Sequence, residues 1–180
     1  MGKAYALGPL PLQPSAMLLI RPAVVTDAQD ICEVVRRSIV ELCVLDHRND
    51  PALLAAWLAN KQPETVARWI ADAGNRCLVA EVDDRLRAAG CVTRSGEVTL
   101  NYVDPSVRFR GVSSALLEGL ERAALGDGNT VVSLGSTATA RRFYVARGYR
   151  EHGVPGNKHG LLVFRMRKSL LRGATAHDHA

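Results

Sequence analysis

Hydrophobic positions recur along the chain with two different spacings, and the spacing separates the expected helices from the expected strands. Behind Thr26, apolar residues return every three or four positions, which indicates an amphipathic helix of about four turns. These apolar positions are Ile31, Val34, Val35, Ile39 and Leu42. Thr26 and Gln29 have the spacing of a capping box, so we expect this helix to begin at Thr26.

The same patterns, together with proline and glycine at segment ends, predict the remaining elements. Strands are expected at 17–20, 77–82, 86–93, 97–103, 130–134 and 161–166, and further helices at 51–60, 63–71, 111–125 and 137–147. The β-branched run at 130–134 is typical of a strand buried on both faces. The predicted fold is therefore α/β, with helices around a central, mostly antiparallel mixed sheet.

One domain accounts for the length of the chain. The 180 residues are 47% hydrophobic, which is enough to build one sizeable core. We expect this domain over residues 17–170, with a flexible N-terminal extension at 1–16 and a flexible C-terminal tail at 171–180. No apolar run approaches the roughly 20 residues that cross a bilayer, and the N-terminus lacks a signal-peptide pattern, so we expect a cytoplasmic protein without a membrane partner.

The residue types that most often bind metals do not form a recognisable set. The cysteines, at positions 32, 43, 77 and 91, are widely spaced and without a nearby histidine. We expect them to be small core residues in a reducing compartment. His177 and His179 form an isolated pair in the tail. No metal site is predicted.

Charge is distributed unevenly between the two parts of the chain. Residues 1–100 carry 11 basic and 12 acidic side chains, whereas residues 101–180 carry 12 basic and 6 acidic ones. An anionic partner is therefore expected in the second part. The arginines are scattered and are not interleaved with aromatic residues, which favours a phosphorylated cofactor over nucleic acid.

The passage from the strand at 97–103 into the helix at 111–125 has the chemistry of a phosphate cradle. A helix start leaves backbone N–H groups unpaired and carries a partial positive charge. Gly111 lets an anion approach the backbone, the small Ser113 and Ser114 do not block it, and Arg108 and Arg110 add positive charge.

This passage resembles the acetyl-CoA motif of the GNAT superfamily of acetyltransferases, Gln/Arg-x-x-Gly-x-Gly/Ala, which reads here Arg108-x-x-Gly111-x-Ser113. The segment 136–149 resembles the later motif of the same superfamily, Asn-x-x-Ala-x-x-Phe-Tyr-x-x-x-Gly-Phe/Tyr. The matching residues are Ala140, Phe143, Tyr144, Gly148 and Tyr149. The chain departs from the pattern at Phe109, where glycine is common, at Ser113, and at Thr137, where asparagine is usual. The resemblance extends from about residue 19 to residue 166.

The resemblance implies a single-domain GNAT fold and acetyl-CoA as co-substrate. The residues implied to contact it are Tyr102, Val103, Arg108, Phe109, Arg110, Gly111, Val112, Ser113, Ser114, Thr137 and Arg141. Tyr144 would donate a proton to the departing thiolate, because a phenol and a thiol have comparable reference pKa values. A backbone N–H near Tyr102 would polarise the thioester carbonyl. Glu97 is the first choice for the base that deprotonates the amine.

The resemblance places the amine acceptor near the end of the first helix. Glu41, Asp46 and His47 would line its pocket, and Asn101 would orient it. The implied activity is N-acetylation of the primary amine of a small molecule, by direct transfer in a ternary complex. A protein N-terminus or lysine side chain, or a sensor that binds acyl-CoA without turnover, stay open as alternatives, as does pairing of two copies into a homodimer.

Overall fold

The computed structural model describes residues 17–158 and 160–171. The predicted N-terminal extension (1–16) and nearly all of the predicted tail, with His177 and His179, lie outside the described residues. In chain order the elements are β1 (Leu18–Pro22), η1 (Val25–Asp27), α1 (Ala28–Leu42), α2 (Val44–His47), α3 (Pro51–Leu58), α4 (Pro63–Ala71), β2 (Asn75–Val82), β3 (Arg85–Thr93), β4 (Glu97–Val103), η2 (Pro105–Val107), α5 (Val112–Gly126), β5 (Val131–Ser136), α6 (Ala138–Ala146), β6 (Arg150–Glu151), β7 (Gly156–Lys158) and β8 (Leu161–Ser169).

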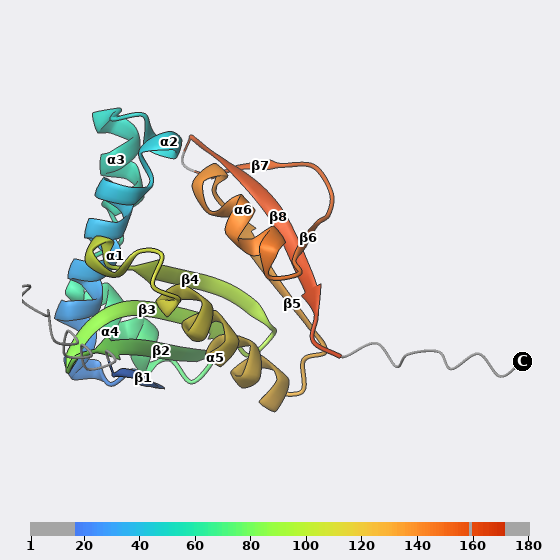
Figure 1. The fold of residues 1–180 in the computed structure, drawn as a ribbon. Helices are drawn as coiled ribbons and strands as arrows, with labels where there is room; N and C mark the ends of the chain where they lie inside the picture. The colour runs from blue at the N-terminus through green and yellow to red at the C-terminus, as the bar shows by residue number, and fades with distance from the viewer. Residues whose placement is uncertain (1–16, 159, 172–180) are drawn as a thin grey trace, which may run out of the picture.

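The eight strands form an open, mostly antiparallel sheet. Its order is β1-β2-β3-β4-β5-β8-β6, and β7 pairs with β8. Among the strands of residues 17–158 and 160–171, only β4 and β5 run parallel, and they share two register pairs, Glu97 with Ser133 and Val98 with Leu134. Beyond Val98 the two strands diverge, so the sheet opens between them (Figure 1). The predicted mixed sheet is confirmed, and this opening is its most consequential feature.

Helices cover the two parts of the sheet unequally. Helix α5 packs against β2, β3 and β4 on one face, whereas α1 and α4 pack on the other face of the same strands (Figure 1). Helix α6 packs against β5 and β8. On α1 the apolar face predicted from the sequence is buried, with Ile31, Val35 and Ile39 at most 3% exposed. Each such side chain contributes about 1.5–3 kcal/mol by leaving water.

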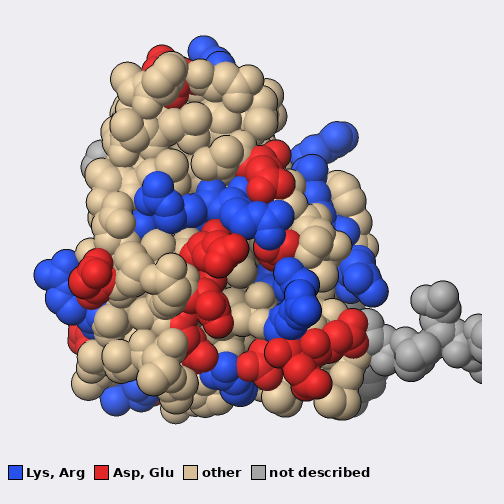
Figure 2. All heavy atoms as spheres, turned by 90° about the vertical axis from the view of Figure 1, so that its left-hand side faces the viewer, with Lys and Arg blue, Asp and Glu red and all other residues tan. Residues whose placement is uncertain are grey.

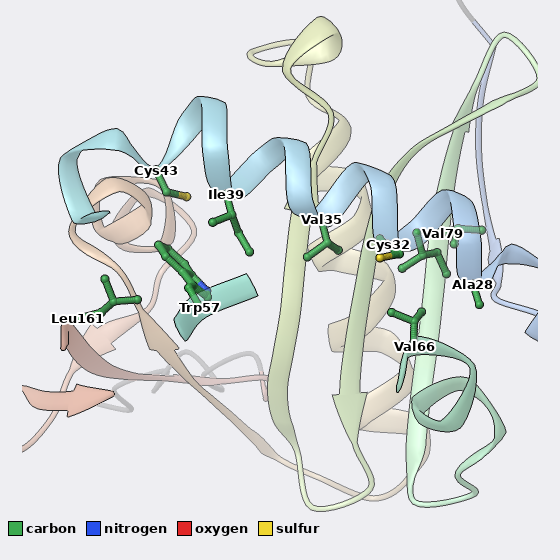
Figure 3. Packing of buried hydrophobic residues seen from close by; sticks show 11 residues of the cluster. Ala28, Cys32, Val35, Ile39, Cys43, Trp57, Val66, Val79 and Leu161 are labelled. Carbon is green, nitrogen blue, oxygen red and sulfur yellow. The ribbon is translucent and has the colours of Figure 1, made fainter. Parts of the chain in front are cut away.

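The core beneath α1 continues toward the C-terminal strands. Figure 3 shows Cys43 and Ile39 at the end of α1 pointing toward Trp57 of α3, with Leu161 of β8 beside it. Trp57 is 8% exposed. Trp57 of α3 therefore packs in one core cluster with residues of α1 and with Leu161 of β8.

Local structure differs from the sequence expectations at several points. The first helix is not capped by Thr26: the turn η1 precedes it, and the Asp27 carboxylate accepts a hydrogen bond from the backbone N–H of Val24 at 2.8 Å. Helix α2 and strands β6 and β7 occupy segments that were expected to be loops. The strand expected at 130–134 is not buried on both faces, because Val132 is fully buried while Val131 is 47% exposed.

Ion pairs on the surface join elements that lie far apart in the chain. Arg21 of β1 contacts Asp27 at 2.7 Å and Glu81 of β2 at 2.6 Å. The Arg21 guanidinium lowers the pKa of the Asp27 carboxyl below its usual value. Figure 2 shows acidic and basic side chains interspersed over the face that includes α1, with few charges on the lobe above it. Among residues 17–158 and 160–171, no helix is long and apolar enough to cross a membrane.

Candidate active site

Two cavities meet at the opening between β4 and β5. The larger has a volume of about 780 Å³ and the smaller about 390 Å³. Both are lined by one shared group of residues at the junction: Trp57, Val98, Thr99, Leu100, Tyr102, Gly135 and Thr137. Beyond Val98, the edge of β4 that faces β5 has no strand partner, so its backbone N–H and C=O groups are available to a ligand. The opening is therefore a passage between two binding spaces.

The loop that leads from β4 to α5 is held in place by Asp104. This residue is 2% exposed, and its carboxylate accepts a hydrogen bond from the backbone N–H of Ser106 at 2.9 Å. It also pairs with Arg37 of α1 at 2.5 Å. Burial by itself would raise the pKa of Asp104, but the hydrogen bonds from Ser106 and the charges of Arg37 and Arg87 outweigh it and lower the pKa. The carboxylate therefore stays ionised and fixes the start of the cradle.

The start of α5 presents unpaired backbone donors to the larger cavity. The N–H groups of Gly111, Val112 and Ser113 have no acceptor within the described part of the chain. Gly111 has φ +80° and a Cβ there would meet nothing within 4 Å, so the space next to the backbone is open. Gly111, Val112, Ser113 and Ser114, which were expected to contact the cofactor, all line the cavity. An anionic group of a cofactor fits this arrangement of donors and helix dipole.

Three arginines line the larger cavity close to the cradle, and two of them come from the α6 segment. Arg108 lines the larger cavity, together with Arg142 and Arg147 of the α6 segment. Arg141 is corrected: it pairs with Glu151 at 2.5 Å and lies over the ring of Phe164, outside the cavity. Neighbouring positions of a helix point about 100° apart, so Arg142 faces the cavity where Arg141 does not.

Arg110 and Arg147 also differ from expectation. Arg110 is exposed and lies outside both cavity walls. Arg147, which no motif indicated, donates a hydrogen bond to the hydroxyl of Ser114 and lies over the ring of Phe143 at 4.9 Å. The cradle therefore combines charges from both sides of the opening.

Phe109 stands at the rim of the larger cavity in an unfavourable conformation. Its φ is +63°, a left-handed value that side chains with a Cβ rarely adopt, and the residue is 90% exposed. The Arg108 guanidinium lies 4.5 Å from the ring centre. This is the position where the superfamily pattern commonly has glycine, and the backbone conformation explains why glycine suits it.

Tyr144 projects from α6 into the larger cavity. It is 7% exposed, and its hydroxyl oxygen accepts a hydrogen bond from the Asn101 side-chain amide at 3.4 Å. Burial raises the pKa of Tyr144 to about 12, and the hydrogen bond from Asn101 opposes part of that increase. The rings of Phe143 and Tyr149 pack edge-on against it at 5.1 and 5.5 Å. Tyr144 is thus a buried, packed phenol that keeps its proton at neutral pH.

A cysteine lines the same cavity, which the sequence did not indicate because Cys43 is distant from both motifs. Burial raises the pKa of the Cys43 thiol to about 12. This thiol is therefore protonated and a weak nucleophile.

Two buried polar atoms in the larger cavity have no partner. Asn101 Oδ1 and Thr139 Oγ1 make no hydrogen bond to the described residues, and both side chains line the cavity wall. An unsatisfied buried polar atom is unfavourable by about 1–3 kcal/mol unless a ligand or water pairs with it. The cavity therefore provides polar contacts for a ligand with amide or hydroxyl groups, beyond those at the cradle.

The other residues expected around the cofactor lie at the junction of the cavities. Tyr102 lines both cavities and Val103 lines the larger one. Burial raises the pKa of Tyr102 above its ordinary value. Thr137 lines both cavities and caps α6, where its hydroxyl accepts a hydrogen bond from the backbone N–H of Ala140 at 3.4 Å.

The residues expected to bind the acceptor are only partly brought together. Glu97 and Asn101 lie in the cavity walls, Glu97 in the smaller cavity and Asn101 in the larger. His47 is corrected, because it is fully buried, its Nδ1 accepts from the Asn49 backbone at 3.0 Å and its Nε2 lies 3.2 Å from the Val40 carbonyl. Both ring nitrogens are used inside the protein.

Glu41 and Asp46 also take structural positions outside both cavity walls. Glu41 pairs with Arg37 at 3.1 Å on the exposed face of α1. Asp46 Oδ1 accepts a hydrogen bond from the backbone N–H of Ala138 at 2.8 Å, so it caps the start of α6. Trp57, which no sequence motif indicated, lines both cavities. Among the described residues, no group of three or more potential metal ligands occurs.

Solved structures with this arrangement are known. A GCN5-related N-acetyltransferase from Rhodopseudomonas palustris superposes with a TM-score of 0.76 at 23% identity, covering 84% of this chain and 95% of that chain. The PaiA N-acetyltransferase from Thermoplasma acidophilum, in complex with coenzyme A, has a TM-score of 0.73 at 17% identity, over 85% and 99% of the two chains. YncA, a putative acetyltransferase from Salmonella typhimurium with acetyl-CoA, has a TM-score of 0.66 at 21% identity, over 91% and 99%.

Sequence comparison identifies the family. A comparison with curated protein sequences gives no significant match. The family description "Acetyltransferase (GNAT) domain" matches residues 44–170, which is more than half of the chain and contains both cavities' principal walls. The sheet that opens between β4 and β5 agrees with that assignment. The chain therefore belongs to the GNAT superfamily of acetyltransferases and is an acyltransferase.

Proposed function

We propose that this protein transfers the acetyl group of acetyl-CoA to a primary amine of a small molecule, directly and within a ternary complex. The observation that carries the proposal is the meeting of two cavities at the opening between β4 and β5, with Tyr144 in the wall of the larger one. One cavity has the donors and arginines that suit a phosphorylated co-substrate. The other is large enough for a small amine.

The larger cavity is the proposed acetyl-CoA site. The free N–H groups of Gly111, Val112 and Ser113 would hold the pyrophosphate, and Arg108, Arg142 and Arg147 would neutralise the phosphates. The unpaired Asn101 Oδ1 can accept a hydrogen bond from an amide N–H of the pantetheine arm. The coenzyme A complex of PaiA and the acetyl-CoA complex of YncA support this choice of ligand.

Acetyl-CoA supplies a thioester whose acetyl group passes to the amine, so that a C–N bond forms, the C–S bond breaks and the sulfur leaves with the electron pair. Tyr144, which lines the larger cavity, would give its hydroxyl proton to that sulfur. The transfer is chemically reasonable, because a phenol and a thiol have comparable reference pKa values and burial keeps Tyr144 protonated at neutral pH. Tyr144 later regains a proton from solvent.

The acceptor must lose a proton as the C–N bond forms. Glu97 lies in the wall of the smaller cavity and is exposed, so it can accept this proton directly or through a water molecule. The free backbone N–H groups of β4 beyond Val98 can polarise the carbonyl oxygen of the acetyl group. In this proposal the proton leaves the amine in the smaller cavity, and the sulfur receives its proton from Tyr144 in the larger one.

The test is an intact-mass screen of primary amines incubated with acetyl-CoA and the protein. The expected result is a gain of one acetyl group on small amines and release of free thiol. Acetylation of peptide N-termini or lysine side chains alone would replace the small-molecule proposal with a protein substrate. Tight binding of acetyl-CoA with no acetylation of any amine would favour a sensor. The cavity volume of about 390 Å³ on the acceptor side favours the small molecule.

A further inference from the structure

The smaller cavity opens over a sheet face that carries polar side chains. Side chains alternate along a strand, so Ser133 of β5 and Arg165 of β8 project to the opposite side from Leu134 and Met166, which are buried beneath α6. Helices cover the corresponding face of β2 and β3, but α6 contacts β5 and β8 from the other side. This polar face is therefore open to a ligand.

The arginines discussed above fall into two groups: some pair with a carboxylate, and others at the cavities, such as Arg108, Arg142 and the exposed Arg165, make no ion pair to the described residues. Arg21, Arg37 and Arg141 each pair with a carboxylate at 3.1 Å or less. Arg165 lines the smaller cavity and makes no ion pair with any residue of 17–158 or 160–171. Its positive charge therefore has no counterpart within the described chain. An anion in the cavity would supply one.

The position of Arg165 relates it directly to the site of transfer. Its register partner across the sheet is Gly135, which lines both cavities at their junction. Neighbouring strands lie about 4.8 Å apart, so the backbone of Arg165 is one strand away from the passage. Gly135 has no side chain, and Val163 of β8 fills the space that a Cβ there would occupy, so Val163 lies on the same face as Arg165 in the cavity wall. His152 lines the same wall.

The opposite wall of the cavity carries a negative charge. Glu97 begins β4, and β5 lies between it and β8. A ligand that spans the cavity thus meets a carboxylate on one side and a guanidinium on the other. This suits a molecule that has both an amine and an anionic group, and it disfavours a simple cationic amine next to Arg165.

We propose that the acceptor is an amine that also carries an anionic group, a carboxylate or a phosphoryl group, bound by Arg165 with His152 beside it. The inference rests on the proposed function and narrows its substrate class. Arg165 binds the substrate and takes no part in proton transfer. Its loss should therefore change the Michaelis constant of anionic acceptors and leave the maximal rate nearly unchanged.

The experiment compares amines in matched pairs that differ by one anionic group: phenethylamine with phenylalanine, and ethanolamine with O-phosphoethanolamine. The proteins are the wild type, Arg165→Gln and the control Arg167→Gln. Arg167 projects to the same face two residues along β8, is exposed and lies outside both cavity walls. Acetyl-CoA affinity, measured by calorimetry, should be the same in all three proteins.

The wild type should have a kcat/KM at least tenfold higher for the anionic member of one pair, and the two pairs distinguish carboxylate from phosphoryl recognition. Arg165→Gln should lower kcat/KM for that member by about 10- to 100-fold, as expected for a hydrogen bond between charged groups, while changing the neutral member less than threefold. Arg167→Gln should change both less than twofold. A preference for the neutral members, or an equal loss on both members in Arg165→Gln, overturns the inference.

A binding measurement separates this inference from the proposed function. The anionic amines are titrated into protein saturated with coenzyme A, without turnover. If no amine is acetylated but phenylalanine or O-phosphoethanolamine binds and Arg165→Gln abolishes the binding, the proposed function fails and the anion site stands. If amines are acetylated but no anionic member binds better than its neutral partner, the anion site is wrong and the proposed function stands.

Discussion

The two parts of the sheet are built on different principles. In β2, the adjacent residues Val79 and Ala80 are both fully buried, because α1 and α4 cover one face and α5 the other. In β5, Val132 is fully buried while Val131 is 47% exposed, because a helix covers only one face. Two register pairs join the parts. The first part is covered by helices on both faces, the second on one face only, and the candidate active site lies where the two parts separate.

The largest expected effect concerns Tyr144, the proposed proton donor in the wall of the larger cavity. Tyr144→Phe removes one oxygen and keeps the ring packing, so acetyl-CoA affinity should stay within about twofold while kcat falls roughly 100- to 10,000-fold. Since burial raises the pKa of Tyr144 to about 12, the wild type should show no loss of rate from this group below about pH 10. A thiol-release assay measures kcat and its dependence on pH, and calorimetry measures the acetyl-CoA affinity.

Tyr149→Phe is the matched control for that change. Tyr149 packs edge-on against Tyr144 and donates a hydrogen bond to Glu121 at 2.9 Å, outside both cavity walls. It should lower stability by about 1 kcal/mol and leave kcat nearly constant. A rate loss below threefold in Tyr144→Phe would remove this residue from the chemistry.

The next effect tests the cradle on the scaffold side. Gly111→Asp places a carboxylate where the pyrophosphate is expected, so acetyl-CoA affinity measured by calorimetry should fall on the order of 100-fold. Gly128→Asp is the control, since Gly128 also has a left-handed φ, +91°, and open space around a Cβ, but follows the other end of α5. Equal affinities in the two variants would mean that the anion binds elsewhere.

The acceptor side should respond through proton transfer. Glu97→Gln keeps the shape of the side chain but cannot accept a proton, so turnover should fall about 100-fold and the lower limb of the pH–rate profile should disappear. Glu118→Gln, on the exposed side of α5, is the control and should behave as the wild type. If the profile of Glu97→Gln keeps its lower limb, water or another group accepts the proton.

A smaller effect tests how the two parts are connected. Asp46 caps α6 from the α2 segment, whereas Asp50 caps α3 and accepts a hydrogen bond from the Ala52 backbone at 2.8 Å. Substituting either by alanine should lower the free energy of unfolding by about 1 kcal/mol, measured by urea denaturation. Only Asp46→Ala should also weaken acetyl-CoA binding, because it loosens the helix that carries Tyr144, Arg142 and Arg147. An equal effect of both on binding would contradict this connection.

The smallest effect should have the opposite sign. Phe109→Gly relieves a left-handed backbone, φ +63°, at the rim of the larger cavity, so the free energy of unfolding should rise by about 1 kcal/mol. Phe109→Ala removes the same ring but keeps the Cβ, so it should bring no such gain. If both variants gain equally, exposure of the ring, and not backbone strain, is the destabilising feature.

The sequence predicted the elements whose signal is local. The 3.6-residue period of α1, the prolines at the starts of α3 and α4, and glycine before α5 each depend on residues within a few positions of one another. The predicted strand at 97–103 agrees with β4 as observed. The cradle residues from Gly111 to Ser114 are likewise adjacent in the chain, which is why a motif could identify them.

The tertiary structure decided every feature that depends on the rotation of a helix or on distant partners. Arg142, and not Arg141, faces the cavity because the packing of α6 sets its rotation. Asp46 caps a helix whose start is 92 residues further along, which no local pattern encodes.

One physical reason separates what the sequence determines from what only the tertiary structure decides. Spacing, propensity and capping act between neighbours in the chain, so the sequence by itself determined the order of elements, the apolar faces and the donors of the cradle. Trp57 and Cys43 enter the site, and His47 leaves it, only because α1, α3 and β8 pack together in space. The opening itself arises because β4 and β5 pair over two residues and then part, and that is decided by what packs on either side of them.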